Sequence, residues 1–249
     1  MMLRRWTAGA MLLVMLALFA SCAGEPRDPV PEPASVSSSE ISSEVPTPSS
    51  APEGSVDPDV SDVAGWQQRN RDVVACIRIE GTNVSFPILH RAGDNEYYLK
   101  HNLNGKKTSK GAIFIEDYNA ADFSDPVTLI YGHRMKNGEM FGKLEKYYSS
   151  QDFMQKHSVI DLYLPDGHQT YRIFAAVPFD KRHLMFAYDF DDPRQYKLFL
   201  NEIFSVRGLN AVTDESLRPE PGEKLIVLST CLWGDKDRRY LVIAKQILS

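Results

Sequence analysis

Apolar and polar residues follow one another from about residue 60 onward in a pattern that predicts a β-rich fold. Short runs of Val, Ile, Leu and aromatic residues, each bounded by Gly, Pro, Asn or Asp, are typical of strands. The turn Pro165–Gly167 separates two such runs and predicts a hairpin. The expected strands are Val73–Ile79, Val84–Leu89, Lys110–Glu116, Val127–Tyr131, Val159–Leu164, Thr170–Val177, Leu225–Leu228 and Tyr240–Ile247.

Three further segments have apolar residues at the three-to-four spacing of a helix. A short helix carrying Trp66 is expected over Asp62–Asp72, a second helix over Met140–His157, and a third over Pro193–Val206. About eight strands against two or three helices predict a mainly β fold, an antiparallel or mixed barrel with the helices packed outside. Residues 60–249 are expected to form this barrel as a single domain.

The first 24 residues have the pattern of a targeting segment. Arg4 and Arg5 precede the uncharged run Trp6–Gly24, in which an apolar centre is followed by small residues. Leu18–Cys22 resembles the lipobox of bacterial lipoproteins, in which the cysteine is lipidated. As a helix, the uncharged run would extend roughly 28 Å, just enough to cross a bilayer. Lipidation of Cys22, an uncleaved anchor and full secretion all stay open, and each places the rest of the chain outside the cytoplasmic membrane.

Residues 25–59 have the composition of a disordered tether. They contain eight of the fifteen prolines, nine serines and no aromatic residue, so they cannot bury enough apolar area to offset the entropy lost on ordering. They also hold eight acidic residues against one arginine. The formal charge of −5 therefore comes from this segment, and residues 60–249 are neutral overall. A chain without a basic surplus argues against nucleic-acid binding.

The cysteines exclude a disulfide scaffold and a zinc site. Cys22, Cys76 and Cys231 are too few and too scattered for the first, and no CxxC pair is present for the second. The histidines other than His133 show no ligand spacing, so neither a metal nor another cofactor is expected. Cys76 lies within a predicted strand and is expected to be a buried thiol.

Cys231 has the surroundings of a nucleophile. It ends an apolar run just before the polar turn Gly234–Asp237, so it is held rigidly yet close to solvent. His133 also follows a predicted strand, and Arg239 opens the last one, where a hairpin would bring it near Cys231. A free thiol has a pKa of about 8.5, and a protonated histidine nearby would stabilise the thiolate.

Two residues beside Cys231 are candidates for substrate binding. Strand alternation puts Ser229 on the same face as Cys231, where its hydroxyl can donate to substrate. Thr230 is adjacent to the nucleophile and by the same alternation is expected to pack.

Four motifs in this order along the chain resemble those of the sortases, the cysteine transpeptidases of Gram-positive surfaces. The run Leu228–Cys231 followed by Arg239–Lys245 resembles their active-site hairpin, and Thr128–His133 resembles their histidine strand. The loop Leu232–Arg238 lacks the Glu-Asp pair that follows the cysteine in well-known members, so no auxiliary carboxylate is carried over. The resemblance covers residues 64–247. Likeness to class B in particular lies in Asp94–Leu99, Gly111–Phe114, His133–Leu144 and the helix near 193–206.

The resemblance implies a single sortase-type eight-stranded β-barrel, with an N-terminal helix and a helix before the cysteine strand. It implies cleavage of a C-terminal sorting signal after Thr, through a thioester on Cys231, and transfer of the protein to a cell-wall amine. His133 would act as acid and base, and Arg239 would stabilise the oxyanion or hold the substrate backbone. The implied partners are surface proteins with an NPxTx-like or related signal, and an amine of peptidoglycan or of its lipid-linked precursor.

Two other functions stay open on the residues alone. A Cys–His hydrolase of cell-wall peptides would release its product to water and would not need the arginine eight residues after the nucleophile. A non-catalytic, membrane-anchored binding module would carry an unreactive Cys231.

Overall fold

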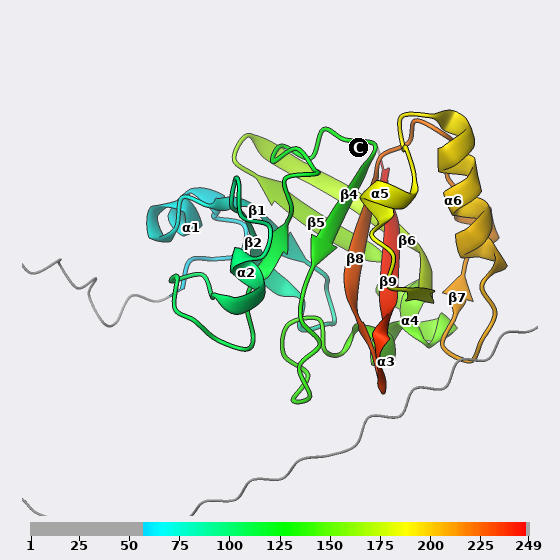
Figure 1. Ribbon diagram of the computed structural model, residues 1–249, viewed down its shortest axis with the longest axis horizontal. Coiled ribbons are helices and arrows are strands. Elements are labelled where there is room, and N and C mark those ends of the chain that lie inside the picture. The colour runs from blue at the N-terminus through cyan, green and yellow to red at the C-terminus, as the bar shows by residue number, and fades with distance from the viewer. Residues whose placement is uncertain (1–56, 248–249) are drawn as a thin grey trace, which may run out of the picture. The chain divides into compact units, whose positions relative to one another are not determined.

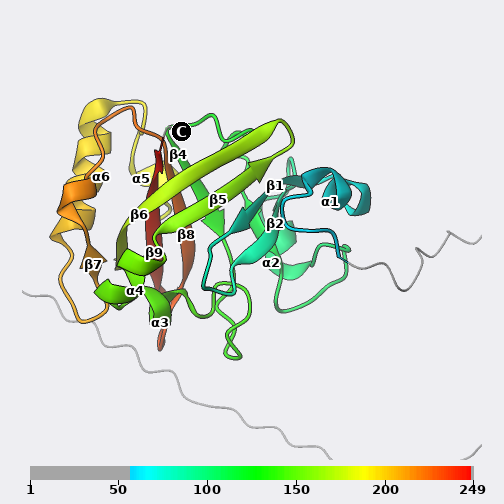
Figure 2. The ribbon, with the colours of Figure 1, turned by 180° about the vertical axis from the view of Figure 1, so that it is seen from behind.

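The computed structural model describes residues 57–247, and within them eight strands close into a barrel (Figure 1). The strands of the whole sheet are β1 (Val73–Arg78), β2 (Ser85–His90), β3 (Ile113–Ile115), β4 (Val127–Tyr131), β5 (Val159–Leu164), β6 (Gly167–Asp180), β7 (Val212–Thr213), β8 (Leu225–Leu232) and β9 (Asp235–Ile247). The order around the barrel is β5-β1-β2-β3-β4-β8-β9-β6, and β6 pairs back with β5. Figure 2 shows the long β6 beside β5 from behind, and the short β7 is attached to β6 outside the ring. The sheet is mixed, because β2 pairs in parallel with β3 and β4 with β8.

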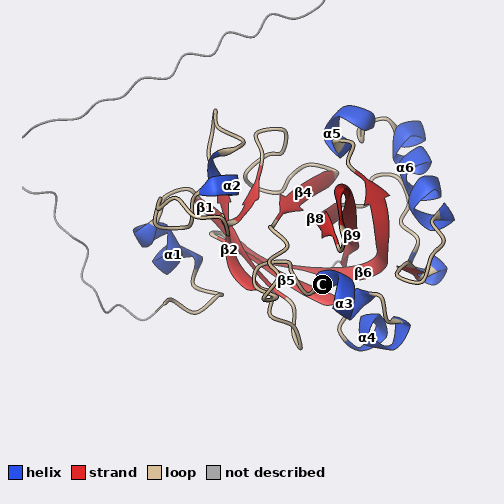
Figure 3. Cartoon of the chain, turned by 60° about the horizontal axis from the view of Figure 1, so that its bottom comes forward, coloured by secondary structure: helices blue, strands red, loops and turns tan. Residues whose placement is uncertain are grey.

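Short helices lie around the outside of the strands (Figure 3). They are α1 (Val63–Arg69), α2 (Tyr97–Lys100), α3 (Leu144–Tyr148), α4 (Gln151–Lys156), α5 (Leu184–Ala187) and α6 (Pro193–Ser205). The predicted eight-stranded barrel, its N-terminal helix and the helix before the cysteine strand are confirmed. Within residues 57–247, no helix is both long enough and apolar enough to span a membrane. The predicted targeting segment with Cys22, and the tether as far as residue 56, lie outside the described residues.

The cysteine strand β8 is buried on both faces, which explains its continuous apolar sequence. Ile226 and Leu228 join the core inside the barrel, whereas Leu225 and Val227 pack outside it in a cluster with α6. The side chains that α6 buries in that cluster are Tyr196, Phe199, Leu200, Ile203 and Phe204. The outward-facing positions that follow along β8 are polar, and the last of them is Cys231.

The segment Met140–His157, predicted as one helix, forms the two short helices α3 and α4 instead. Met140 has a φ of 54°, in the left-handed region, which excludes a helix at that point. Ser150 starts α4 as its N-cap, and its hydroxyl accepts a hydrogen bond from the backbone N–H of Phe153 at 3.3 Å. Because both helices pack against the same core, the apolar spacing continues across the break and conceals it in the sequence.

The strands β8 and β9 extend further than their apolar runs predict. β8 continues through three polar residues to Leu232, and β9 begins at Asp235 instead of Tyr240. Leu232 pairs with Asp235 beside the turn, the register then shifts, and Cys231 lies opposite Arg239. Pairing between backbones therefore holds the end of the barrel that carries the candidate nucleophile. Such pairing leaves no apolar pattern in the sequence, so the strand ends could not be read from it.

Candidate active site

Three neighbouring strands bring His133, Cys231 and Arg239 into one row across the sheet. β4 and β8 pair in parallel with no shift in register. Beyond the end of β4, the backbone N–H of Gly132 donates to the carbonyl oxygen of Ser229 at 3.2 Å. This bond continues the pairing past the end of β4, so His133 comes to lie beside Cys231. On the other side of β8, Cys231 pairs directly with Arg239 of β9. Residues that pair across neighbouring strands point to the same face, which is here the outer face of the barrel.

The guanidinium of Arg239 lies against the sulfur of Cys231. Its Nη1 is 3.9 Å from Sγ, and the same nitrogen donates to the carbonyl oxygens of Lys236 at 3.1 Å and Arg238 at 3.3 Å. These backbone contacts hold the positive charge where negative charge would develop on the sulfur or on an attached substrate oxygen. Arg238, in contrast, is exposed. The structure thus places Arg239, and not Arg238, at the candidate nucleophile.

A backbone carbonyl orients His133. Its Nε2 lies 2.8 Å from the carbonyl oxygen of Leu99. Because a carbonyl oxygen only accepts, Nε2 carries the hydrogen, and Nδ1 is the nitrogen left to exchange a proton with a reacting group. Gly111 lies against the ring, and a Cβ built on it would be 3.1 Å from Cδ2 of His133 and would overlap the carbonyl oxygen of Tyr98. The absence of a side chain at Gly111 therefore leaves room for this histidine position.

The three side chains line one cavity of about 260 Å³ on the outer face of the barrel. The predicted substrate-binding residues Ser229 and Thr230 border the same cavity. Ser229 faces it beside Cys231. Thr230 pairs with Tyr240, and its side chain alternates toward the barrel interior, where Oγ1 is buried and has no hydrogen-bond partner among the described residues. Of the two, only Ser229 presents its hydroxyl to the cavity.

The cavity also contains a polar cluster that was not predicted from the sequence. Nε2 of His183 lies 2.7 Å from Oε2 of Glu116 and 3.3 Å from the hydroxyl of Tyr131. Burial and the nearby carboxylate of Glu116 raise the pKa of Tyr131 well above its usual value, so its phenol stays neutral. The position of Glu116 could have been recognised in the sequence as that of a site residue. It is a charged residue at the end of an apolar run, and Cys231 and His133 also follow apolar runs. His183 lies in a loop before α5, where no such pattern marks it.

Cys76 does not line the cavity of the candidate site. It is fully buried beside Trp66, as predicted, and burial raises the pKa of its thiol to about 12. Cys231 is only half-buried. In the part of the chain that the structure describes, no group of three or more His, Cys, Asp or Glu side chains is arranged to hold a metal ion.

Comparisons of the sequence and of the structure with known proteins point to the same family. Residues 77–247 match the model of the sortase domain. The chain is 30% identical over 165 residues to sortase B of Listeria monocytogenes, a match that covers 66% of this chain and 65%, just under two thirds, of the Listeria protein. The crystal structure of Clostridium perfringens sortase B superposes with a TM-score of 0.66 at 27% identity, covering 74% of this chain and 99% of that one. The Staphylococcus aureus sortase B–substrate complex superposes with a TM-score of 0.65 at 26% identity, covering 76% and 86%.

Proposed function

The chain belongs to the sortase family, as a class B sortase, and from this premise we propose that it is a cysteine transpeptidase acting on C-terminal sorting signals. The acyl donor is a surface protein with a Thr before the scissile bond, in an NPxTx-like or related signal. The acceptor is a primary amine of peptidoglycan or of its lipid-linked precursor. The observation that carries the proposal is the row of His133, Cys231 and Arg239 at one cavity.

The first half of the reaction transfers the acyl group to the enzyme. Sγ of Cys231, as the thiolate, attacks the carbonyl carbon of the substrate Thr and forms a C–S bond. The guanidinium of Arg239 stabilises the negative charge that develops on the carbonyl oxygen, an interaction worth about 3 kcal/mol per donor in other acyl-transfer sites. His133 donates a proton to the leaving amine while the C–N bond breaks. The hydroxyl of Ser229, on the same face, is assigned to substrate binding.

The second half transfers the acyl group to the acceptor. The amine nitrogen attacks the thioester carbonyl, and the C–S bond breaks as the tetrahedral intermediate collapses. His133 takes the proton that the amine loses, Cys231 leaves as the thiolate, and the enzyme returns to its starting state. A hydrolase would use water in this step, and an inert binding module would have no use for a half-exposed thiol between a histidine and an arginine.

The products formed with and without an amine test this proposal. With a Thr-containing sorting peptide alone, we expect slow release of the hydrolysed product. Adding a primary amine that mimics the wall acceptor should divert the thioester, so that amide product rises with amine concentration while hydrolysis falls. Mass spectrometry measures both products. Fast hydrolysis with no amide product, across a wide range of amines, would identify a cysteine hydrolase instead.

Substitution of Gly111 tests the position of His133. Gly111 has a φ of 59° and no space for a Cβ, so Gly111→Ala should cost about 2–4 kcal/mol of folding free energy and lower kcat/KM roughly tenfold by displacing the imidazole. Gly93→Ala is the matched control, because Gly93 has a φ of 80° with no atom within 4 Å of an added Cβ. It should show only the backbone cost of about 1–2 kcal/mol and unchanged kcat/KM. Urea unfolding and peptide cleavage measure the two effects. Equal activity losses in both variants would contradict the assigned contact.

We also propose that the enzyme acts on the outer face of the cytoplasmic membrane, attached through its N-terminus. The proposal is supported by the order of Arg4 and Arg5, the uncharged run Trp6–Gly24 and the tether that follows. Metabolic labelling with a fatty-acid analogue, in the wild type and in Cys22→Ala, distinguishes a lipid anchor from an uncleaved helix. A protein found in the medium, with neither label nor membrane association, would contradict the attachment.

A further inference from the structure

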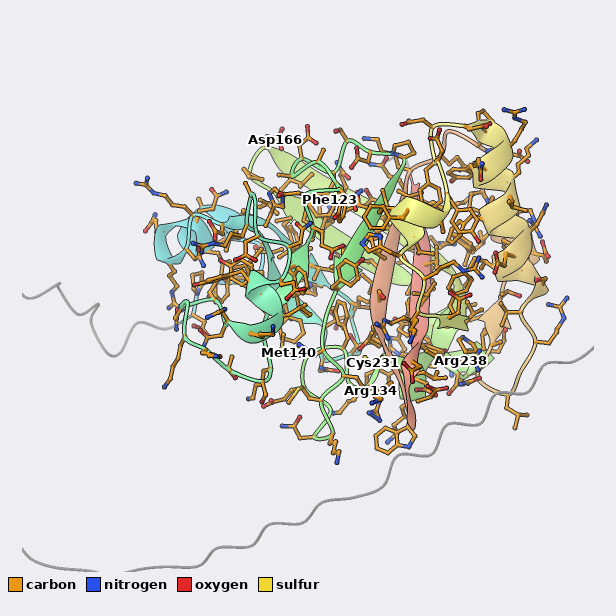
Figure 4. The ribbon with its side chains drawn as sticks, in the orientation of Figure 1. Phe123, Arg134, Met140, Asp166, Cys231 and Arg238 are labelled. Atoms are coloured by element: carbon orange, nitrogen blue, oxygen red, sulfur yellow. The ribbon has the colours of Figure 1, made fainter. Side chains whose placement is uncertain are left out.

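A second cavity, of about 470 Å³, is lined by residues that lie next to those of the first cavity along the chain. The two cavities share consecutive parts of the chain: His133 lines the first and Arg134 the second, while Cys231 lines the first and Trp233 the second. The pairing of β4 with β8 brings the segment of Arg134 beside that of Cys231, and Figure 4 draws both at the lower end of the barrel strands. A molecule bound in the second cavity would therefore be next to a thioester on Cys231.

The lining of this cavity is strongly positive. It includes the cations Arg134, Lys136, Lys143 and Lys146, and among the described residues none of the four forms an ion pair. Its single carboxylate, Glu145, accepts hydrogen bonds from the backbone N–H of Trp233 at 2.8 Å and from Nδ2 of Asn210 at 3.1 Å. Since residues 60–249 are neutral overall, this local excess of four cations over one carboxylate is a specific feature of the site.

An exposed indole forms one wall of the cavity. Trp233 is 64% exposed, and the guanidinium of Arg134 lies 3.7 Å from the centre of its ring. The hydrogen bond from its backbone N–H to Glu145 fixes the loop that carries it. A large aromatic ring held in water beside unpaired cations is typical of a recognition surface, because it offers a flat apolar face next to anion-binding groups.

We propose that this second cavity binds the amine acceptor through anionic groups, phosphate or carboxylate, that the acceptor carries near its primary amine. The inference rests on the proposed function, in which an acceptor must reach the thioester while the acyl donor occupies the first cavity. A positive cavity attracts anions and repels a bare ammonium ion. The same cations favour the neutral form of an amine brought in on an anionic molecule, and that form is the nucleophile. Trp233 packs on an apolar or ring face of the acceptor.

Comparison of acyl transfer by the full chain to three different acceptors tests the inference. The acceptors are triglycine amide, which lacks an anionic group, triglycine with its free carboxylate, and O-phosphoethanolamine. The ratio of amide to hydrolysis product is measured for each at equal concentration. We expect at least one anionic acceptor to exceed triglycine amide by about tenfold, and this excess to shrink as ionic strength rises. Preference for the phosphate or for the carboxylate compound identifies the anionic group.

Charge reversal supplies the matched variants. Lys136→Glu/Lys146→Glu changes two exposed lysines of the cavity and should abolish the preference for anionic acceptors, whereas Lys106→Glu/Lys197→Glu makes the same charge change at exposed lysines elsewhere and should keep it. Trp233→Ala should lower transfer to every acceptor. Calorimetric titration of Cys231→Ala with inorganic diphosphate gives a readout without turnover, and binding should be lost when the two cavity lysines are also reversed.

Two failures are distinguishable. Equal transfer to neutral and anionic acceptors, or a preference that survives Lys136→Glu/Lys146→Glu, would overturn the acceptor site while leaving the transpeptidase intact. Absence of any peptide cleavage by the wild type would overturn the proposed function itself. Diphosphate binding that is unaffected by the lysine reversal would also overturn the acceptor site.

Discussion

Cys231→Ala is expected to reduce cleavage of the sorting peptide to background, a loss of at least ~10⁴-fold in kcat. The variant keeps the cavity and the neighbouring Arg239 but removes the sulfur atom in that cavity that would form the thioester. Cys76→Ala is the matched control, since it removes a thiol that is fully buried and does not line the cavity. It should leave kcat/KM within about twofold, because the Cys76 thiol does not line the cavity that holds Cys231.

Thiol labelling adds a readout that does not depend on activity. In the native protein, iodoacetamide should modify Cys231 and leave Cys76 unmodified, because Cys76 is buried and its pKa is raised to about 12. Peptide-level mass spectrometry assigns the label, and circular dichroism verifies folding of both variants. Equal losses of cleavage in two folded variants would remove Cys231 from its role as the nucleophile.

Arg239→Ala should lower kcat/KM by about 10²–10³-fold, because the charge that stabilises the oxyanion is lost. The effect should appear mainly in kcat if Arg239 acts in the transition state, and mainly in KM if it holds the substrate backbone. Arg239→Lys should recover little of the loss. A lysine keeps the charge, but it lacks the further guanidinium N–H groups that can donate to a substrate oxygen while Nη1 contacts Cys231 and the two backbone carbonyls.

Arg238→Ala is the control for that result, since it removes the same charge from the adjacent, exposed position. It should leave kcat/KM within about threefold, as expected for a surface charge in high dielectric. Steady-state kinetics with one peptide compares all three variants. If Arg238→Ala proved damaging and Arg239→Ala did not, the assignment of the arginine would be wrong by one position.

The proximity of Cys231 and Arg239 was predictable because both residues belong to one hairpin. An eight-residue spacing within one hairpin brings the two side chains near each other. Their direct opposition depends on a break in register between Cys231 and Leu232, which the spacing does not predict. The position of His133 was not predictable in this way. It depends on parallel pairing between β4 and β8, which are distant in sequence, and apolar runs do not state which strands pair. Only the resemblance of the motifs supplied that neighbour.

Contacts made by loop residues could not be predicted from the sequence. His183 reaches Glu116 from the segment between β6 and α5, and Trp233 reaches Arg134 across two different turns. Such contacts depend on tertiary packing, and they leave neither periodicity nor spacing behind. The break at Ser150 was concealed for a different reason, since packing on one core preserved the helical spacing across it.

The parallel contact between β4 and β8 also determines when the site can exist during folding. The β8–β9 hairpin is local in sequence, so the thiol and the guanidinium can meet early. Pairing of Val127 with Leu225 requires closure of a very long loop, whose entropy cost makes such contacts slow to form. Until that closure, Cys231 has its arginine but not its histidine. A newly made or partly unfolded chain therefore lacks a complete acyl-transfer site, and completion of the barrel is the step that creates it.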